Sequence, residues 1–191
     1  MALPDTAKIV LGTPLVFANS GEYVPTDAGQ PATIDADIDL GALAASSAAL
    51  RQSVKLDLGS ANLDILWSMK AYLEWHTAPA AGGSVDFYLG WSNDATAGED
   101  NPANLSGTDA AYVGYGAAAA DGIEALQQLE FIGSLITTAD ADIQVALIGD
   151  FIPKARYCML VVINKSSVNL ANTDAIETGV AITPMQYQVQ D

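Results

Sequence analysis

Residues 154–165 read KARYCMLVVINK, and this stretch decides how the fold is interpreted. From Tyr157 to Asn164, seven of the eight side chains are apolar or aromatic. A strand with one face in water alternates apolar and polar residues, because successive side chains point to opposite faces. This run does not alternate, so it predicts a strand that is covered on both faces. The second cover is either a segment of the same chain, such as residues 92–122 or the N-terminal arm, or another subunit.

Most other strand candidates alternate with period two. Residues 84–92, for example, place Val85, Phe87 and Leu89 on one face and shorter or more polar residues between them. This pattern is typical of half-buried strands. We expect strands near residues 14–18, 33–40, 51–58, 64–76, 84–92, 128–137, 142–151, 156–164 and 177–189.

Many strands with irregular spacing and little helix predict an all-β fold, an antiparallel β-sandwich that is jelly-roll-like with about eight to nine strands. A chain of 191 residues is long enough for one such domain. We expect a single sandwich over residues 31–191, preceded by an extended N-terminal arm or edge strand over residues 1–30. Residues 123–129 predict one short helical turn, and residues 41–50 are either a short helix or an Ala-rich loop.

Composition excludes several classes of partner. The formal net charge is −16, from 23 acidic and 7 basic side chains. Nucleic-acid binding needs Lys and Arg to replace phosphate counterions, and anionic membranes also attract basic segments, so neither partner is expected. The apolar runs are far shorter than the roughly 20 residues that span a bilayer. The N-terminus lacks a signal-peptide pattern, so we expect no Sec-type export.

Residues that carry chemistry are few. His76 is the only histidine and is predicted at a strand end on the surface, and Cys158 lies inside the apolar run, where a core thiol is expected rather than a nucleophile. The single cysteine permits no intrachain disulfide. The acidic stretches 35–39 and 93–101 are either a structural calcium site or a solvated acidic face, and they lack EF-hand spacing. We predict no catalytic residue, no metal and no cofactor.

Aromatic residues divide into core and surface candidates. Trp67, Trp75 and Trp91 share the apolar faces of their strands, which favours core packing over a platform for sugar rings. Other aromatic and apolar side chains lie on the opposite faces, where they can contact a partner. The interface candidates are Tyr72, Tyr88, Tyr157, Met159, Val161 and Ile163.

Four stretches carry a resemblance to a known family: RQSVKLDLG, VDFYLGWSNDATAGEDNPANLSGTDAAYVGY, LQQLEFIGSLITTADADIQVALIGDFIPKARYCMLVVINKSS and the closing VAITPMQYQVQD. Together they cover roughly residues 50–191 and resemble small structural proteins of tailed-phage virion gene clusters, which decorate heads or build other virion parts. The resemblance implies a non-enzymatic capsid decoration or cement-type subunit in the virion, assembled in the host cytoplasm. It also implies docking on the major capsid protein. We expect a homo-oligomer, with a trimer favoured.

Two other function classes stay open. One is a carbohydrate- or receptor-binding β-sandwich module of a phage fibre or tail, with a glycan as partner, which predicts an exposed aromatic platform. The other is an enzyme such as a glycoside hydrolase on a jelly roll, which predicts two carboxylates facing each other across a cleft.

Overall fold

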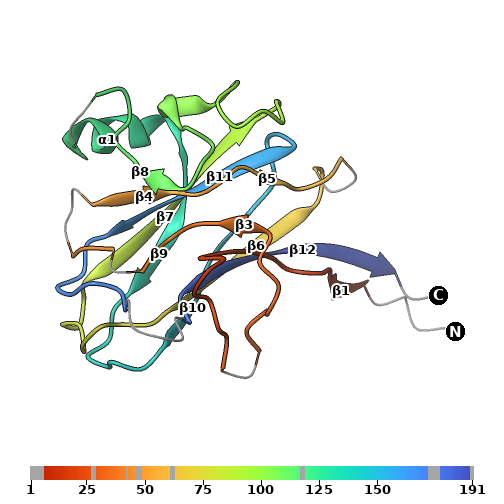
Figure 1. Ribbon diagram of the computed structural model, residues 1–191. Helices are drawn as coiled ribbons and strands as arrows, with labels where there is room; N and C mark the ends of the chain where they lie inside the picture. Colours follow the sequence, from red (N-terminus) through yellow and green to blue (C-terminus); the bar gives the residue numbers. More distant parts are fainter. Residues whose placement is uncertain are drawn as a thin grey trace, which may run out of the picture.

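The computed structural model describes residues 7–26, 29–41, 43–45, 49–60, 63–116, 119–171 and 177–189. Two largely antiparallel β-sheets pack face to face, and one short α-helix lies outside the second sheet (Figure 1). The prediction of an all-β sandwich is therefore confirmed. Within the described residues, no helix is long and apolar enough to cross a membrane.

The first sheet is built around β12, the longest strand. In spatial order it contains β10 (Gln144–Phe151), β6 (Leu66–Leu73), β12 (Gly179–Val189), β2 (Leu15–Ala18) and β3 (Ala36–Asp37). A further strand, β1 (Ala7–Leu11), pairs with the C-terminal half of β12. All pairs in this sheet are antiparallel except that of β2 with β3.

The second sheet is built around β11. In spatial order it contains β8 (Ala110–Ala111), β4 (Leu50–Gln52), β11 (Tyr157–Asn164), β7 (Ser84–Ser92) and β9 (Glu130–Ile136). The short strand β5 (Leu56–Asp57) continues along the same edge of β11 as β4. Ser53 bridges the interruption, since its N–H donates to Leu160 O and its Oγ accepts from Leu160 N, both at 2.9 Å.

The main strands pair in a nested order along the chain. β2 pairs with β12, β4 with β11, β6 with β10 and β7 with β9, so early strands meet late ones and middle strands meet each other. Two successive Greek keys produce such nesting, and the order is compatible with the predicted jelly roll. The nesting brings residues about 165 positions apart in sequence into register at β2 and β12.

The principal core lies between the two sheets. Alternating residues of both sheets enter it, among them Trp67 and Phe87, which are almost fully buried. The core predictions for Trp67 and Trp75 are confirmed. Trp91 lies half-buried at the rim, where its Nε1–H donates to Glu130 Oε2 at 2.7 Å.

Several predicted elements differ from the observed ones. The strand expected over residues 33–40 shrinks to β3, and the strand expected over residues 51–58 is broken into β4 and β5. The predicted helical turn is longer, as α1 (Ala119–Ala125) followed by the 3-10 turn η2 (Leu126–Gln128), and a second 3-10 turn, η1 (Pro102–Asn104), precedes it. No helix occurs in the described part of residues 41–50, of which residues 42 and 46–48 lie outside the description.

The predicted N-terminal arm is partly a strand of the sandwich. Val16, Phe17 and Ala18 of β2 are at most 1% exposed, because they pair with β12 inside the sheet. Only β1 retains the character of an edge strand. The sandwich therefore begins before residue 31, while residues 1–6 and 27–28 of the predicted arm lie outside the described residues.

Both long sides of the sandwich are closed by contacts between the sheets. On one side a Cβ on Gly133 would lie only 2.3 Å from Ile148 O, so glycine lets β9 and β10 approach. On the other side Arg51 binds Asp109 through two hydrogen bonds of 2.7 and 2.6 Å, and Asp109 also accepts from Asp39 N. The hydrogen bond to Asp109 raises the pKa of Arg51.

Candidate functional site

The second face of β11 is covered by the same chain. Cys158, Leu160 and Val162 belong to the principal core, whereas Met159, Val161 and Ile163 belong to a second cluster on the outer side of the sheet. We call residues 102–129 the cover segment. The second cluster also contains Leu50, Ala103, Leu105, Tyr112, Ala125, Leu126 and Leu129. The same-chain cover that the sequence left open is therefore the one observed.

The cover segment buries three of the predicted interface residues. Met159, Val161 and Ile163 are each 0% exposed in the single chain, so none of them offers a surface to a second subunit. The reason is the apolar content of the cover segment, whose Leu105, Leu126 and other side chains fill the face that the sequence left open to a partner.

Polar anchors and close packing seat the cover segment. The buried Tyr112 hydroxyl donates to Ala103 O at 2.7 Å, and burial raises the pKa of Tyr112 to about 12. Asn104 Nδ2 donates to Gly114 O at 2.5 Å. Leu105 packs so closely on β7 that a Cβ on Gly90 would lie 2.3 Å from Leu105 Cδ1. A side chain at position 90 would therefore displace the cover.

One ammonium group holds the loop that leads into the cover segment. Lys55 Nζ lies within hydrogen-bond distance of four oxygens: Ser92 Oγ at 2.9 Å, the carbonyl oxygens of Asp94 and Thr96 at 2.8 Å, and that of Glu99 at 3.0 Å. Removal from water lowers the pKa of Lys55. The 93–101 stretch, considered above as a calcium loop, thus wraps a cation that the chain itself supplies.

The acidic stretch 35–39 supplies acceptors to neighbouring backbone. Asp35 Oδ2 accepts from Val16 N at 2.9 Å, and Asp37 Oδ1 accepts from Ser20 N at 2.9 Å. Asp39 Oδ1 accepts from Gly41 N at 3.0 Å. In the part of the chain that the structure describes, no three His, Cys, Asp or Glu side chains gather as a metal site would require.

A half-open groove runs between the cover segment and the second sheet. We call it the Tyr88 groove. Its volume is about 520 Å³, and it is lined by Tyr88, Ile123, Leu126, Gln127, Leu129, Phe131 and Lys165. The rings of Tyr88 and Phe131 lie 5.2 Å apart and are tilted by 53°, and Phe131 is 54% exposed. The groove therefore presents an aromatic pair to solvent.

A salt bridge between Lys165 and Asp86 borders this groove. Asp86, which is 7% exposed, accepts from Lys165 Nζ at 2.5 Å and from Ser134 Oγ at 2.7 Å. The hydrogen bond to Asp86 raises the pKa of Lys165, while burial raises the pKa of Tyr88. Because Asp86 compensates Lys165, the groove suits a neutral ligand better than an anion.

The two remaining tyrosine candidates lie elsewhere. Tyr72 is 5% exposed on the outer face of the first sheet and its hydroxyl donates to Gly29 O at 3.1 Å. Tyr157 is half-buried, with the Arg156 guanidinium 5.2 Å from its ring centroid. The structure thus does not bring the six interface candidates together into one surface.

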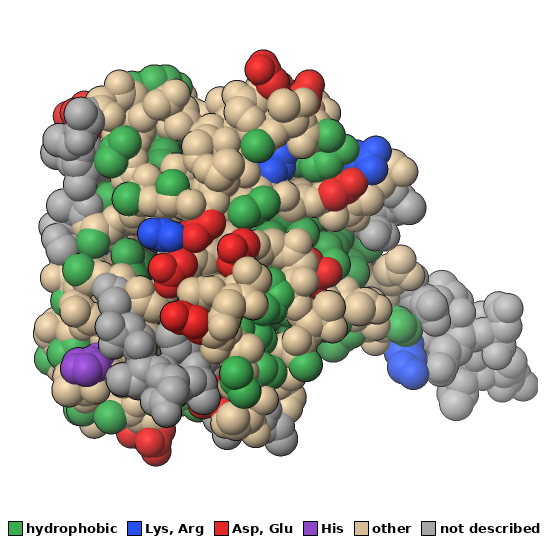
Figure 2. All heavy atoms as spheres, in the orientation of Figure 1, with side chains coloured by type: hydrophobic (Ala, Val, Ile, Leu, Met, Phe, Trp, Pro, Cys, Tyr) green, Lys and Arg blue, Asp and Glu red, His purple; other side chains and the backbone are tan. Residues whose placement is uncertain are grey.

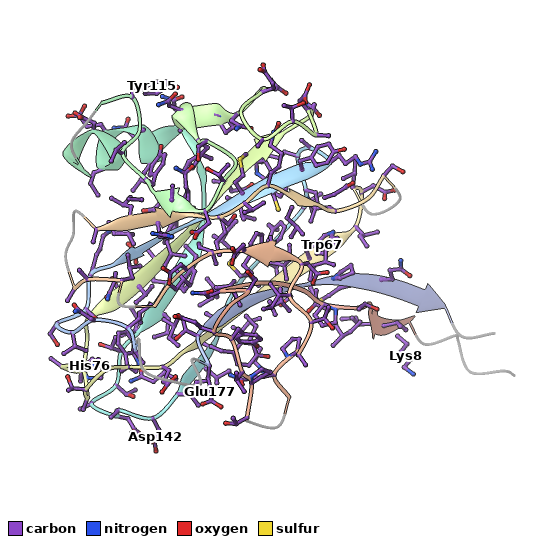
Figure 3. All side chains as sticks on the ribbon, in the orientation of Figure 1. Lys8, Trp67, His76, Tyr115, Asp142 and Glu177 are labelled. Atoms are coloured by element: carbon purple, nitrogen blue, oxygen red, sulfur yellow. The ribbon has the colours of Figure 1, made fainter. Side chains whose placement is uncertain are left out.

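A two-stranded projection also exposes apolar side chains. β6 pairs with β12 as far as Met185, so beyond that residue β12 pairs with β1 alone. We call residues 7–11 and 185–189 the ribbon. Figure 1 shows it projecting from the body of the sandwich, and Figure 3 places Lys8 on the projection and Trp67 near its base. Ile9 and Leu11 of the ribbon are 52% and 63% exposed.

The histidine and the cysteine lie where the sequence places them. His76 is exposed and follows the β-bridge of Trp75 with Leu170, on the side of the molecule away from the ribbon (Figure 3). Cys158 is 0% exposed, and burial raises the pKa of its thiol, which opposes nucleophilic chemistry there.

Sequence reasoning missed three features that now stand out: the Lys55 clamp, the exposed Phe131 and the ribbon. Phe131 lies opposite Tyr88 because the register of β7 and β9 shifts between Phe87 and Tyr88. A one-residue shift moves side chains to the other face, so alternation in the sequence carried no signal for it. Likewise, Lys55 lies on the polar face of an alternating segment, so the sequence predicted only that its side chain is solvated.

Comparison with protein-family models, with curated proteins and with solved structures finds no match to this chain. The cover segment, the Tyr88 groove and the ribbon are the features of this chain that bear on its function.

Proposed function

We propose that this protein is a non-enzymatic structural subunit that associates with copies of itself and docks on a larger particle, as a decoration or cement-type subunit of a tailed-phage virion does. The observation that supports this proposal is the ribbon. It carries exposed apolar side chains away from the sandwich, and beyond Met185 its strands pair only with each other among the described strands.

A free two-stranded ribbon is a poor structure in isolation. Two-stranded β-structure is marginally stable in water unless it packs on something. Exposed apolar side chains on such an element mark an interaction surface. A subunit that attaches to a particle gains from an element that reaches beyond its own body, and the ribbon has that form.

The proposal is tested by measuring mass and particle binding together. We expect the purified chain to be an oligomer by light scattering and to co-sediment saturably with expanded tailed-phage heads. A chain that stays monomeric, ignores the heads and is retained on a polysaccharide column would contradict it.

The Tyr88 groove favours a second candidate, a carbohydrate- or receptor-binding module. Aromatic faces stack on the apolar faces of sugar rings, and the groove combines Tyr88 and Phe131 with polar atoms of Gln127 and Lys165. The neutralised Asp86–Lys165 pair fits an uncharged glycan.

A glycan array separates this candidate from the first. We expect Phe131→Ala to abolish any signal that depends on the groove, whereas Ile136→Ala, at an equally exposed position of the same strand, should leave it unchanged. Equal signals from both variants would rule out the groove as the glycan site.

A further inference from the structure

The outer edge of β1 is unpaired among the described strands. β1 pairs with β12 on one side only, in a register that joins Lys8 to Gln188, Ile9 to Tyr187 and Leu11 to Met185. Edge strands offer N–H and C=O groups to another chain unless bulges, prolines or charges block them. One hydrogen bond shows which backbone groups of β1 face outward.

That bond is Gly12 N to Pro184 O, at 2.8 Å, which continues the register of the ribbon by one pair. In antiparallel strands, hydrogen-bonded pairs alternate with pairs that are not bonded to each other. Residues 8, 10 and 12 therefore direct their backbone groups toward β12, and residues 7, 9 and 11 direct theirs toward the free edge. Ile9 is the central residue of that edge.

Side chains of the ribbon separate by the same parity. Residues directly opposite in the register share a face, so Ile9 and Leu11 lie on the same face of the ribbon as Met185. These three residues are apolar, whereas Lys8 and Gln186 lie on the other face. The free edge and the apolar face are thus provided by the same residues of β1.

The distribution of charge also favours the ribbon as the contact between two copies. Residues 7–18 and 179–189 contain one lysine and no acidic residue, in a chain of net charge −16. Copies of so acidic a chain repel each other through most of their surface. In the view of Figure 2, acidic side chains are spread over the body, and the described part of the projection shows hydrophobic and basic side chains. Two ribbons can approach without that repulsion.

We propose that β1 of one copy pairs antiparallel with β1 of a second copy, with Ile9 opposite Ile9 and residue 7 opposite Leu11. This inference rests on the self-association in the proposed function and names its contact. The outward groups of residues 7, 9 and 11 then bond to each other, and Lys8 lies opposite Val10 rather than opposite another lysine. The product is a four-stranded sheet across two subunits, with a continuous apolar face for the particle.

Such a contact is isologous and closes at two copies. It therefore specifies a dimer, in place of the trimer that the sequence favoured. The β1 edge is preferred to the free edge of β12 because β12 offers outward backbone groups beyond β6 only at residues 187 and 189.

A pair of single-cysteine variants tests the register. In a hydrogen-bonded antiparallel pair the Cα atoms lie about 5.5 Å apart, within the range that a disulfide bridges. Ile9→Cys should therefore give a disulfide-linked dimer under mild oxidation. In Leu11→Cys the two sulfur-bearing residues are offset by four positions, roughly 14 Å, and should not cross-link. Background from the native thiol is small, because Cys158 is buried.

The masses of the unmodified chain and of Ile9→Pro complete the test. We expect two chains for the former and at least tenfold weaker association for the latter, since proline removes an outward N–H and leaves the bonds to β12 in place. A three-chain mass, or cross-linking of Leu11→Cys as efficient as that of Ile9→Cys, would overturn the β1 pairing while self-association stands. A single-chain mass with binding to heads overturns the pairing and the self-association, while docking on the particle stands. A single-chain mass without head binding overturns the proposed function as well.

Discussion

Strands β11 and β12 occupy equivalent central places in the two sheets, yet they are covered very differently. β11 is buried on both faces along its length, by the opposite sheet and by the cover segment. β12 is buried over its first half and then leaves the sandwich, where β1 is its only partner among the described strands. Both sequences are rich in apolar residues. What differs is whether the same chain supplies a second layer.

The difference shows that an apolar strand face has two outcomes. At β11, about thirty residues of loop, short helix and turn from the same chain cover the outer face of the strand. At the ribbon, exposed Ile9 and Leu11 remain after folding is complete. The covered face of β11 contributes to the stability of the fold, whereas the exposed ribbon is available for contact with another molecule. Substitutions in the two regions should therefore have different effects.

The largest effect should come from a charge placed beneath the cover segment. Met159→Asp buries a carboxylate in an apolar cluster, which we expect to cost about 5 kcal/mol or more and to prevent folding. Gln186→Asp introduces the same group on the exposed ribbon and should fold normally. Circular dichroism and soluble yield measure the difference. A folded, soluble Met159→Asp monomer would mean that the cover opens easily.

Truncation of a cover leucine should have the next largest effect. Leu105→Ala removes a side chain that is 3% exposed and packs against Gly90, which should lower the free energy of unfolding by about 2–4 kcal/mol. The matched change on the ribbon, Leu11→Ala, should alter it by no more than about 0.5 kcal/mol. Urea denaturation compares them. Similar losses in both variants would contradict the distinction between a covered strand and a free ribbon.

Removal of the Lys55 ammonium should loosen the entry to the cover segment. Lys55→Met removes the ammonium group from three carbonyl oxygens of the loop, which should lower stability by about 1–3 kcal/mol. Lys70→Met, at an exposed lysine above the Tyr72 ring, should change stability by less than about 1 kcal/mol. Hydrogen exchange of residues 93–101 should accelerate only in the first variant. Unchanged exchange there would show that the loop holds itself.

The smallest effect concerns an exposed ion pair where β11 begins. Arg156 binds Asp57 through hydrogen bonds of 2.8 and 2.7 Å, and these hydrogen bonds lower the pKa of Asp57. A lowered pKa in the folded state stabilises the fold above the unfolded value of about 4, and this contribution is lost as pH falls through the folded value.

Asp57→Asn should therefore lose a small part of the stability measured at pH 7 and lose less than the unmodified chain on acidification to pH about 3. Urea midpoints at both pH values measure this. Asp64→Asn changes the net charge equally and is the control. An identical pH response of the two variants would show that the pair does not couple to folding.

Local pattern predicted most of the strands. Residues 84–92 form β7 with the predicted bounds, and β11 begins one residue after its predicted start, because alternation and long apolar runs report burial directly. The prediction failed where the chain breaks a strand for a contact distant in sequence. Between β4 and β5, Val54 N donates to Asp37 O and Lys55 N donates to Gly107 O instead of to β11, and no local signal marks these pairings.

The candidate sites were less predictable than the strands. Phe131 reaches the Tyr88 groove through a register shift, and Lys55 becomes a clamp only because residues 94–99 fold around it. The roles of Phe131 and Lys55 depend on contacts between distant segments, and the properties of single residues do not predict such contacts. Met159, Val161 and Ile163 failed as interface candidates for the same reason, since the cover segment that buries them lies roughly 30 to 60 residues away in the sequence.

By itself the sequence determined that the chain is an acidic all-β protein and that residues 157–163 are covered on both faces, because side-chain parity and charge are local properties. Only the tertiary structure decided what supplies that cover and where apolar surface is left over. The cover segment closes over β11, while Ile9 and Leu11 of the ribbon stay exposed. Burial depends on the complete path of the chain, so the same apolar pattern is core in one strand and free surface in the other.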